Sequence, residues 1–187
     1  DGTRIVTASG DDTVRVWDAA TGQPITTLVG HTETIFSAAF SPDGTRIVTA
    51  SRDETARVWD TATGQPITTL EGHAEWVRSA SFSPDGTRIV TASVDRTARV
   101  WDAATGQSIT TLEGHTNAVQ FAAFNPDGTR IVTSWSETAR VWDAATGQPI
   151  TTLEGHTGVV IFAAFSPDGT RIVTASWDET ARVWSLR

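Results

Sequence analysis

The sequence predicts an all-β fold assembled from repeated units, and three observations carry this prediction. The phrase DGTRIVT recurs 42 residues apart at Asp43, Asp85 and Asp127, and once more, after 41 residues, at Asp168. No stretch keeps the hydrophobic period of a helix over roughly ten positions. Short β-branched runs alternate instead with turn sequences such as Ser-Pro-Asp-Gly. A fixed period of this length indicates a repeat architecture, so one unit has to be interpreted before any single residue.

One unit contains four expected strands and their turns. Pro42 and Gly44 fit a hairpin turn, because proline presets the backbone and glycine accepts a positive φ. Pro66 fits the start of an edge strand, since it cannot donate to a ladder. The unit is therefore expected to be an antiparallel meander. Its strands are predicted at Ile35–Phe40, Arg46–Ala50, Thr55–Trp59 and Ile67–Leu70.

Four short motifs carry a family resemblance. They are Gly30-His31, Ser41-Pro42-Asp43-Gly44, Ser51-x-Asp53 and Trp59-Asp60. In this order and spacing they resemble the WD-repeat (WD40) signature, and the chain is similar to the bacterial-type arrays of near-identical repeats in this family. The resemblance implies a β-propeller of four-stranded antiparallel blades, about 4.5 per chain and without helices, with strands a to d ordered from the central channel outward.

The repeat boundaries divide the chain into blades of one WD-repeat segment, residues 1–187. The expected partition is a partial blade of strands b, c and d at 1–30, full blades at 31–72, 73–114 and 115–155, and a partial blade of strands a, b and c at 156–187. Because the chain starts inside a unit and without Met, we expect an excised fragment or an engineered segment, and a natural protein stays open as the alternative. The strand arrangement at a junction between two chains stays open.

Composition excludes several classes of function. There is no cysteine, so disulfides and thiolate metal sites are excluded. The net charge of −8 argues against nucleic acid and anionic membranes as partners. We expect no metal and no cofactor, since ligand spacings and Gly-rich phosphate loops are missing. A soluble chain is expected, with the cytoplasm as the favoured compartment.

His, Ser and Asp recur together at the same positions of the second, third and fifth units and could suggest a nucleophilic triad. The resemblance implies another role, a buried hydrogen-bonded tetrad that the Trp of strand c completes. Because the group recurs in each blade, whereas a catalytic site normally occurs once, we expect a structural role and no enzyme activity. The expected tetrads are His31, Ser51, Asp53 and Trp59; His73, Ser93, Asp95 and Trp101; and His156, Ser176, Asp178 and Trp184.

Two units depart from this pattern. The first has no His, because its Gly-His would precede Asp1. The fourth reads TSWSET where the others read TASxDxT, and counting back from Trp142 puts Ser136 in the Asp position. We therefore expect His115 to lack a carboxylate partner and strand b of this blade to lose one residue, with a bulge or a slip in register.

The repeats differ at two places, the start of strand a and the residue before the turn Asp. In a propeller both places are expected at one mouth of the channel. Large aromatic residues near arginines there resemble a partner-binding surface, and repeat drift with channel packing is the alternative. The predicted mouth contains Phe36, Arg52, Trp76, Arg78, Trp135 and Trp177.

The leading functional prediction is a non-enzymatic scaffold that binds proteins or peptides and closes its ring by forming a homodimer. The alternative is a self-assembling half-propeller whose only partner is itself. A fold does not fix a function, so the family resemblance supplies the first prediction. The second depends on end blades that would expose apolar faces and unpaired backbone groups. A monomeric four-bladed ring is the competing arrangement.

Overall fold

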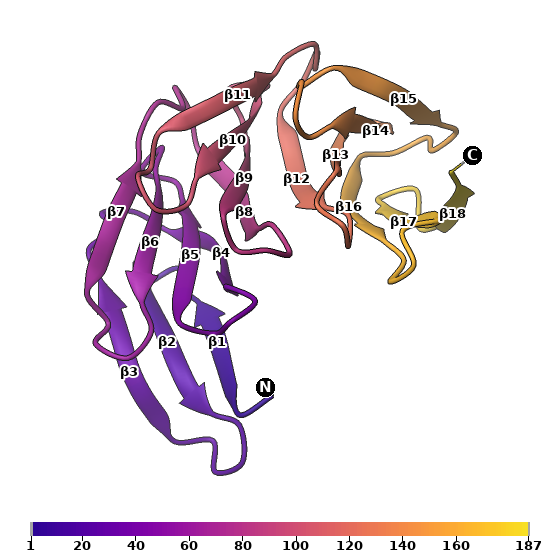
Figure 1. Cartoon of the computed structure of the whole chain (residues 1–187). Coiled ribbons are helices and arrows are strands. Elements are labelled where there is room, and N and C mark those ends of the chain that lie inside the picture. Colours follow the sequence, from indigo (N-terminus) through magenta and orange to yellow (C-terminus); the bar gives the residue numbers. More distant parts are fainter. Residues whose placement is uncertain (1, 187) are drawn as a thin grey trace.

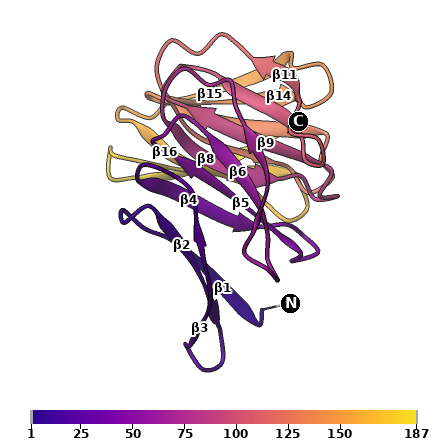
Figure 2. The same cartoon turned by 90° about the vertical axis from the view of Figure 1, so that its left-hand side faces the viewer.

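The computed structural model describes residues 2–186, which form 18 strands in five antiparallel sheets and no helix. Each sheet is a meander in which consecutive strands pair, and we number these sheets as blades one to five. Figure 1 shows them side by side along an open arc, with the chain running from one end to the other. Figure 2 shows the same sheets as successive layers, with β1 to β3 at one end.

The blades have the following strands. The first contains β1 (Arg4–Ala8), β2 (Thr13–Asp18) and β3 (Pro24–Val29). The second contains β4 (Ile35–Phe40), β5 (Arg46–Ser51), β6 (Ala56–Asp60) and β7 (Pro66–Leu70). The third contains β8 (Val77–Phe82), β9 (Arg88–Ser93), β10 (Ala98–Asp102) and β11 (Ser108–Leu112). The fourth contains β12 (Val119–Phe124), β13 (Arg130–Trp135), β14 (Thr138–Asp143) and β15 (Pro149–Glu154). The fifth contains β16 (Val160–Phe165), β17 (Arg171–Ser176) and β18 (Ala181–Ser185).

The core lies between the blades. Because side chains alternate along a strand, each blade has a valine face and an opposite face with isoleucine and tryptophan. Val14 and Val16 of the first blade pack against Ile47 and Trp59 of the second. The next three seams repeat this arrangement. A blade alone cannot bury either face, so the stability of the arc depends on contacts between neighbours.

The all-β propeller architecture of about 4.5 blades is confirmed. The strands β4, β8, β12 and β16 lie on the inner side of the arc and β7, β11 and β15 on the outer side (Figure 1). Strand b of a full blade is one residue longer than predicted and includes Ser51. In the part of the chain that the structure describes, no helix is long and apolar enough to cross a membrane.

The prediction that the fourth blade loses a residue from strand b is wrong. Strand β13 keeps six residues, and its partner Val119 faces Trp135 as Ile35 faces Ser51 in the second blade. The missing residue comes from the following turn, where Trp135 pairs with Thr138 across only two residues. A deletion inside the strand would turn its side chains to the opposite face, whereas the turn absorbs it with Ser136 at a φ of 42°.

Candidate functional site

Each tetrad joins two strands to the loop before strand a through one threonine hydroxyl. In the second blade, Nδ1 of His31 lies 2.7 Å from a carboxylate oxygen of Asp53. Its Nε2 lies 2.7 Å from Oγ1 of Thr49, and the indole Nε1 of Trp59 donates to the same oxygen at 2.9 Å. The third and fifth blades repeat these contacts with Thr91 and Thr174. The hydroxyl in the tetrad is therefore a threonine.

The assignment of Ser51, Ser93 and Ser176 to the tetrads is wrong. The Ser51 hydroxyl accepts a hydrogen bond from the backbone N–H of Asp53 and donates to the carbonyl of Glu33, so it holds the turn in place. Ser93 and Ser176 do the same in their blades. The register explains this: Trp59 pairs with Ile47 at the far end of the hairpin, and Thr49, two residues from Ile47, is its diagonal neighbour.

The tetrad carboxylates are held in the charged form. Burial opposes ionisation of Asp53, but hydrogen bonds from His31 and Thr55 outweigh it and lower the pKa of this carboxyl well below its usual range. The pKa of Asp95 is lowered in the same way by His73 and Thr97 against burial. For Asp178 the bond from Thr180 is the largest cause of a lowered pKa. Each carboxylate thus orients a neighbouring imidazole ring.

Replacing Thr49 with Val is expected to lower the free energy of unfolding by about 1–3 kcal/mol, because the Trp59 indole N–H loses its buried acceptor. The Trp59 indole N–H resonance in an NMR spectrum should move as that hydrogen bond disappears. Ser51→Ala is the matched control, since it removes a buried hydroxyl that does not contact the indole. An unchanged indole resonance in Thr49→Val would contradict the assignment.

The tetrad of the fourth blade is incomplete, as the sequence predicts. Thr133 still joins Trp142 and His115, at 2.8 and 2.9 Å. Nδ1 of His115 is buried and, among residues 2–186, has no hydrogen-bond partner. Trp135 packs edge-on against this imidazole, with ring centroids 4.6 Å apart. Burial, with a smaller contribution from Arg140, lowers the pKa of His115 to about 4.

In the first blade, which has no histidine, the aspartate has a different partner. Trp17 donates to Thr7 at 2.8 Å, as in the other blades. Arg15 replaces the imidazole as a partner of Asp11, with an N–O distance of 2.8 Å. Hydrogen bonds from Thr13 and then from Arg15 lower the pKa of Asp11. The indole–threonine contact is therefore common to all five blades, whereas the histidine–aspartate contact is confined to three.

Four predicted mouth residues form one stacked group. The guanidinium of Arg52 lies over the Trp76 ring at 4.4 Å, and that of Arg78 lies over the Phe36 ring at 4.6 Å. The two aromatic rings are 6.1 Å apart. Within the described part of the chain, neither guanidinium donates a hydrogen bond or forms an ion pair. We name Phe36, Arg52, Trp76 and Arg78 the mouth cluster.

The other two predicted mouth residues, Trp177 and Trp135, lie in different environments. Trp177 is 70% exposed and borders the same hollow as Phe36 and Arg78, so it belongs beside the mouth cluster. The assignment of Trp135 to the mouth is wrong, because this residue is only 5% exposed and packs on His115. The shortened turn explains the difference: Trp135 takes the strand position of Ser51 rather than the turn position of Arg52.

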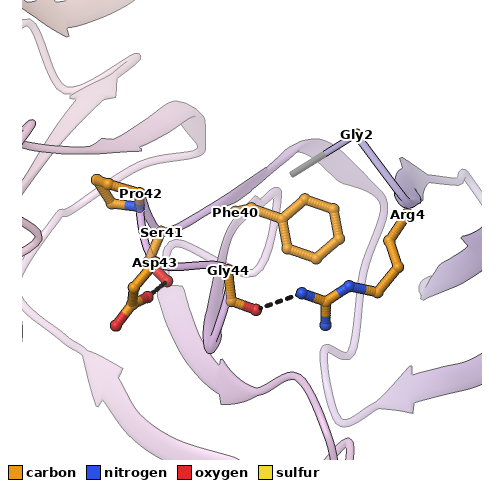
Figure 3. A pocket seen from close by; sticks show the side chains of 7 residues that line it. All are labelled: Gly2, Arg4, Phe40, Ser41, Pro42, Asp43 and Gly44. Carbon is orange, nitrogen blue, oxygen red and sulfur yellow. Dashed lines mark hydrogen bonds between the residues drawn. The ribbon is translucent and has the colours of Figure 1, made fainter.

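A second repeated contact was not predicted from the sequence. Figure 3 shows Arg4 reaching from the first blade to the Asp43-Gly44 turn of the second, where it donates to the Gly44 carbonyl at 3.0 Å. Its guanidinium also lies over the Phe40 ring. Arg46 and Arg88 make the same contact with Gly86 and Gly128 of the following blades. We name this contact the arginine latch. The Arg that recurs in each DGTRIVT phrase is the feature of the sequence from which the contact could have been predicted.

No group of three or more His, Asp or Glu residues within residues 2–186 is placed to hold a metal ion. The hollow lined by Arg4, Phe40 and Gly44 belongs to the arginine latch and so to the contact between two blades. The mouth cluster is therefore the strongest candidate for a binding surface, since it combines partly exposed aromatic rings with unpaired charge.

A scan against protein-family models matches the WD domain, G-beta repeat, five times. The matches cover residues 1–18, 22–60, 64–102, 106–143 and 147–185. Each full match begins with the outer strand of one blade and continues through the first three strands of the next, so it spans a seam. These matches cover most of the chain, and their ranges agree with its repeated strand order. The chain therefore belongs to the WD-repeat family, as an array of near-identical repeats.

Proposed function

We propose that this chain is a non-enzymatic scaffold that binds a peptide segment of a partner protein at the mouth cluster. The observation that carries the proposal is the stacking of two unpaired guanidinium groups on Trp76 and Phe36. Aromatic and arginine side chains are the residues that most often dominate binding energy at protein interfaces. WD-repeat domains generally mediate protein interactions, which agrees with this role.

The chemistry of the mouth cluster favours a segment with carboxylates beside apolar side chains. A guanidinium that lies flat on a ring keeps N–H donors at its edge, and these match a carboxylate geometrically. The hollow beside Phe36 and Arg78 also contains Phe121 and Ile161, so an apolar side chain can be buried there. The net charge of −8 acts at longer range and is largely screened at physiological salt.

A labelled peptide of alternating Glu and Phe is expected to bind saturably, as measured by fluorescence anisotropy. Trp76→Ala and Arg78→Ala should each weaken its affinity by about tenfold or more, since each removes half of a cation–π pair. Ile109→Ala is the matched control, because this residue is 51% exposed on the outer strand β11, away from the mouth cluster.

A Lys–Phe peptide of equal length tests the charge preference. Equal affinity for both peptides would contradict the role of the two arginines. An equal effect of Ile109→Ala would show that binding is not confined to the mouth cluster, and absence of saturable binding of the Glu–Phe peptide would contradict the proposal itself.

The tetrads have a structural role under this proposal. Their threonine hydroxyls already accept from an indole and contact an imidazole, so no nucleophile is left for a substrate. The same group occurs in the second, third and fifth blades, as expected of a packing unit that is repeated with the blade. We therefore propose no catalytic residue in this chain. We also propose that the blades divide the chain at the repeat boundaries given by the sequence.

A second candidate function is self-association into a closed ring, either together with peptide binding or as the only activity. The observation that favours it is the apolar surface on the two end blades, where Ile5 is 51% and Val183 is 66% exposed. Burial of such surface stabilises an assembly by about 25 cal/mol per Å². Light scattering on the native chain should give at least twice the mass of one chain, and this mass should persist on dilution.

A further inference from the structure

We propose that this chain binds the free C-terminus of a partner protein whose last residue is apolar. The terminal carboxylate is held by side chains of the inner strands β4, β8 and β12 (Figure 1), in a hollow beside the mouth cluster. This inference rests on the proposed function and adds which part of the partner binds. We name the site the inner hollow; it borders Phe36 and contains Ser37, Arg78, Ser79, Gln120, Phe121 and Ile161.

A bulge near the start of each inner strand turns one side chain into the inner hollow. In β4 a shift in register leaves Phe36 without a partner across the ladder. The residues left unpaired in the same way in β8, β12 and β16 are Arg78, Gln120 and Ile161. All four line the one hollow. Bulges commonly re-aim a side chain beside a functional site, and here four blades bring four different side chains to one place.

Two serine hydroxyls and one amide in the inner hollow have hydrogens without an acceptor. Ser37 Oγ accepts a hydrogen bond from the backbone N–H of Ala80 at 3.2 Å, and Ser79 Oγ accepts one from that of Ala122 at 3.1 Å. Within the described part of the chain, neither hydroxyl donates in turn, and the Gln120 amide makes no hydrogen bond. Because both serine oxygens already accept, their O–H hydrogens are free to donate to a ligand.

The inner hollow also carries positive charge. The Arg78 guanidinium lies over the Phe36 ring at 4.6 Å and forms no ion pair with any residue between 2 and 186. Among these residues, no Asp or Glu lines the hollow. One guanidinium, two hydroxyls and one amide therefore form a set of donors without a counter-charge. A carboxylate matches this set, because it supplies only acceptors together with a negative charge.

The carboxylate is assigned to a chain end because apolar residues lie directly beside the donors. Phe121 of β12 occupies the position of Ser79 in β8, and Ile161 of β16 occupies that of Gln120. A C-terminal residue carries its carboxylate and its side chain on one Cα, so both enter the hollow together. The rest of the peptide then leaves toward the mouth cluster. Capture of a terminal carboxylate is a recurring mode of peptide recognition.

The size of the inner hollow favours the same ligand. Its volume is about 320 Å³, near the lower limit of about 300 Å³ for ligand sites. An internal Asp or Glu continues into chain on both sides, and two such segments need more room than one. A terminal residue needs only one way out.

The donors lie inside the array and are held by contacts between blades. Ser37, Arg78, Ser79 and Gln120 belong to the second, third and fourth blades, each of which packs against a blade on both sides. The two serine hydrogen bonds connect β4 to β8 and β8 to β12. The same contacts that join these blades thus fix the hydroxyls in place, which reduces the cost of ordering them when a ligand binds.

The test compares three peptides, each labelled at its N-terminus, by fluorescence anisotropy. The first alternates Glu and Phe and ends in Phe with a free carboxylate. The second is the same peptide with a C-terminal amide, and the third is the amide with one extra Glu at its N-terminus, which restores the net charge. The free acid is expected to bind about tenfold or more tightly than either amide, because only its end accepts charge-assisted hydrogen bonds.

Two variants locate this preference in the inner hollow. Gln120→Leu and Ser79→Ala should each reduce the preference for the free acid to about threefold or less, while the affinity for the amides stays the same. Gln120→Leu should fold, because the equivalent residues of β4 and β16 are the apolar Phe36 and Ile161. Circular dichroism checks the fold of both. Ile109→Ala, on the outer strand β11, is the control and should keep the full preference.

The outcomes separate this inference from the proposed function. Equal affinity for the free acid and the charge-matched amide, with binding still weakened by Trp76→Ala, would overturn the terminal carboxylate and leave the mouth cluster as a binding surface. A preference that persists in full in Gln120→Leu and in Ser79→Ala would overturn the inner hollow as its site. Absence of saturable binding of all three peptides would overturn the proposed function itself.

Discussion

Replacing Trp59 with Ala is expected to lower the free energy of unfolding by about 3–5 kcal/mol, the range for truncating a large buried side chain. This indole is 1% exposed and fills the seam between the first and second blades, where it contacts the layer that contains Val14 and Val16. Its N–H donates to Thr49, so the substitution also removes a buried hydrogen bond. Denaturant unfolding, followed by circular dichroism, measures the loss.

Trp76→Ala is the matched control for Trp59→Ala. Trp76 is partly exposed in the mouth cluster, under Arg52 and outside the seams, and its loss should change the free energy of unfolding by less than about 1 kcal/mol. The comparison removes what is common to any Trp→Ala substitution, such as changes in fluorescence. Equal losses in the two variants would contradict both the seam role of Trp59 and the surface role of Trp76.

The stability of the chain is expected to fall by about 3 kcal/mol between pH 6.5 and pH 4 because of His115 alone. Its pKa is lowered from 6.5 to about 4 in the folded state, so the unfolded state binds a proton more readily throughout this window. The stabilisation is therefore complete above the unfolded pKa and is lost as the pH falls toward the folded pKa. Urea unfolding at a series of pH values measures this loss.

His115→Gln is the control, because glutamine does not titrate in this range. The native chain should lose about 3 kcal/mol more than this variant between pH 6.5 and pH 4. The other three histidines are common to both proteins and cancel in the difference. The pKa values of Asp53 and Asp95 are lowered in the folded state, so these groups stabilise the fold. This stabilisation is lost mainly as the pH falls below their ordinary value of 3.8. Parallel curves would contradict the burial of an unpaired imidazole.

Much of the fold can be predicted from the sequence because each unit contains recognisable turn residues. Ser41-Pro42-Asp43-Gly44 is a hairpin turn in the structure, with Gly44 at a φ of 70°, and strand β4 has the predicted bounds. The family motifs also located the partners of His31 and Trp59 to within two residues. The choice of Ser51 over Thr49 was wrong because sequence spacing does not include the register across the hairpin. Counting outward from the turn would have placed Ser51 beside Thr55, far from Trp59.

The fourth blade shows the other limit of sequence reasoning. An alignment that counts back from Trp142 assigns the deleted residue to strand b, whereas hydrogen bonding assigns it to the turn. The energy difference between these placements arises from side chains that would change faces, and this appears only when the neighbouring blades are present. Trp135 therefore moved from a predicted surface position to a buried position against His115.

The uniformity of the seams has a consequence for how such a gene can change in length. Gaining or losing one unit of 42 residues would add or remove one valine face and one isoleucine–tryptophan face together, so every other seam would keep its contacts. Unequal recombination between the DGTRIVT phrases is thus expected to yield folded arcs of different curvature and extent. The positions that differ between copies, such as Phe36 and Trp76, would be reshuffled in the process. Ligand preference could then diversify while the packing stays constant.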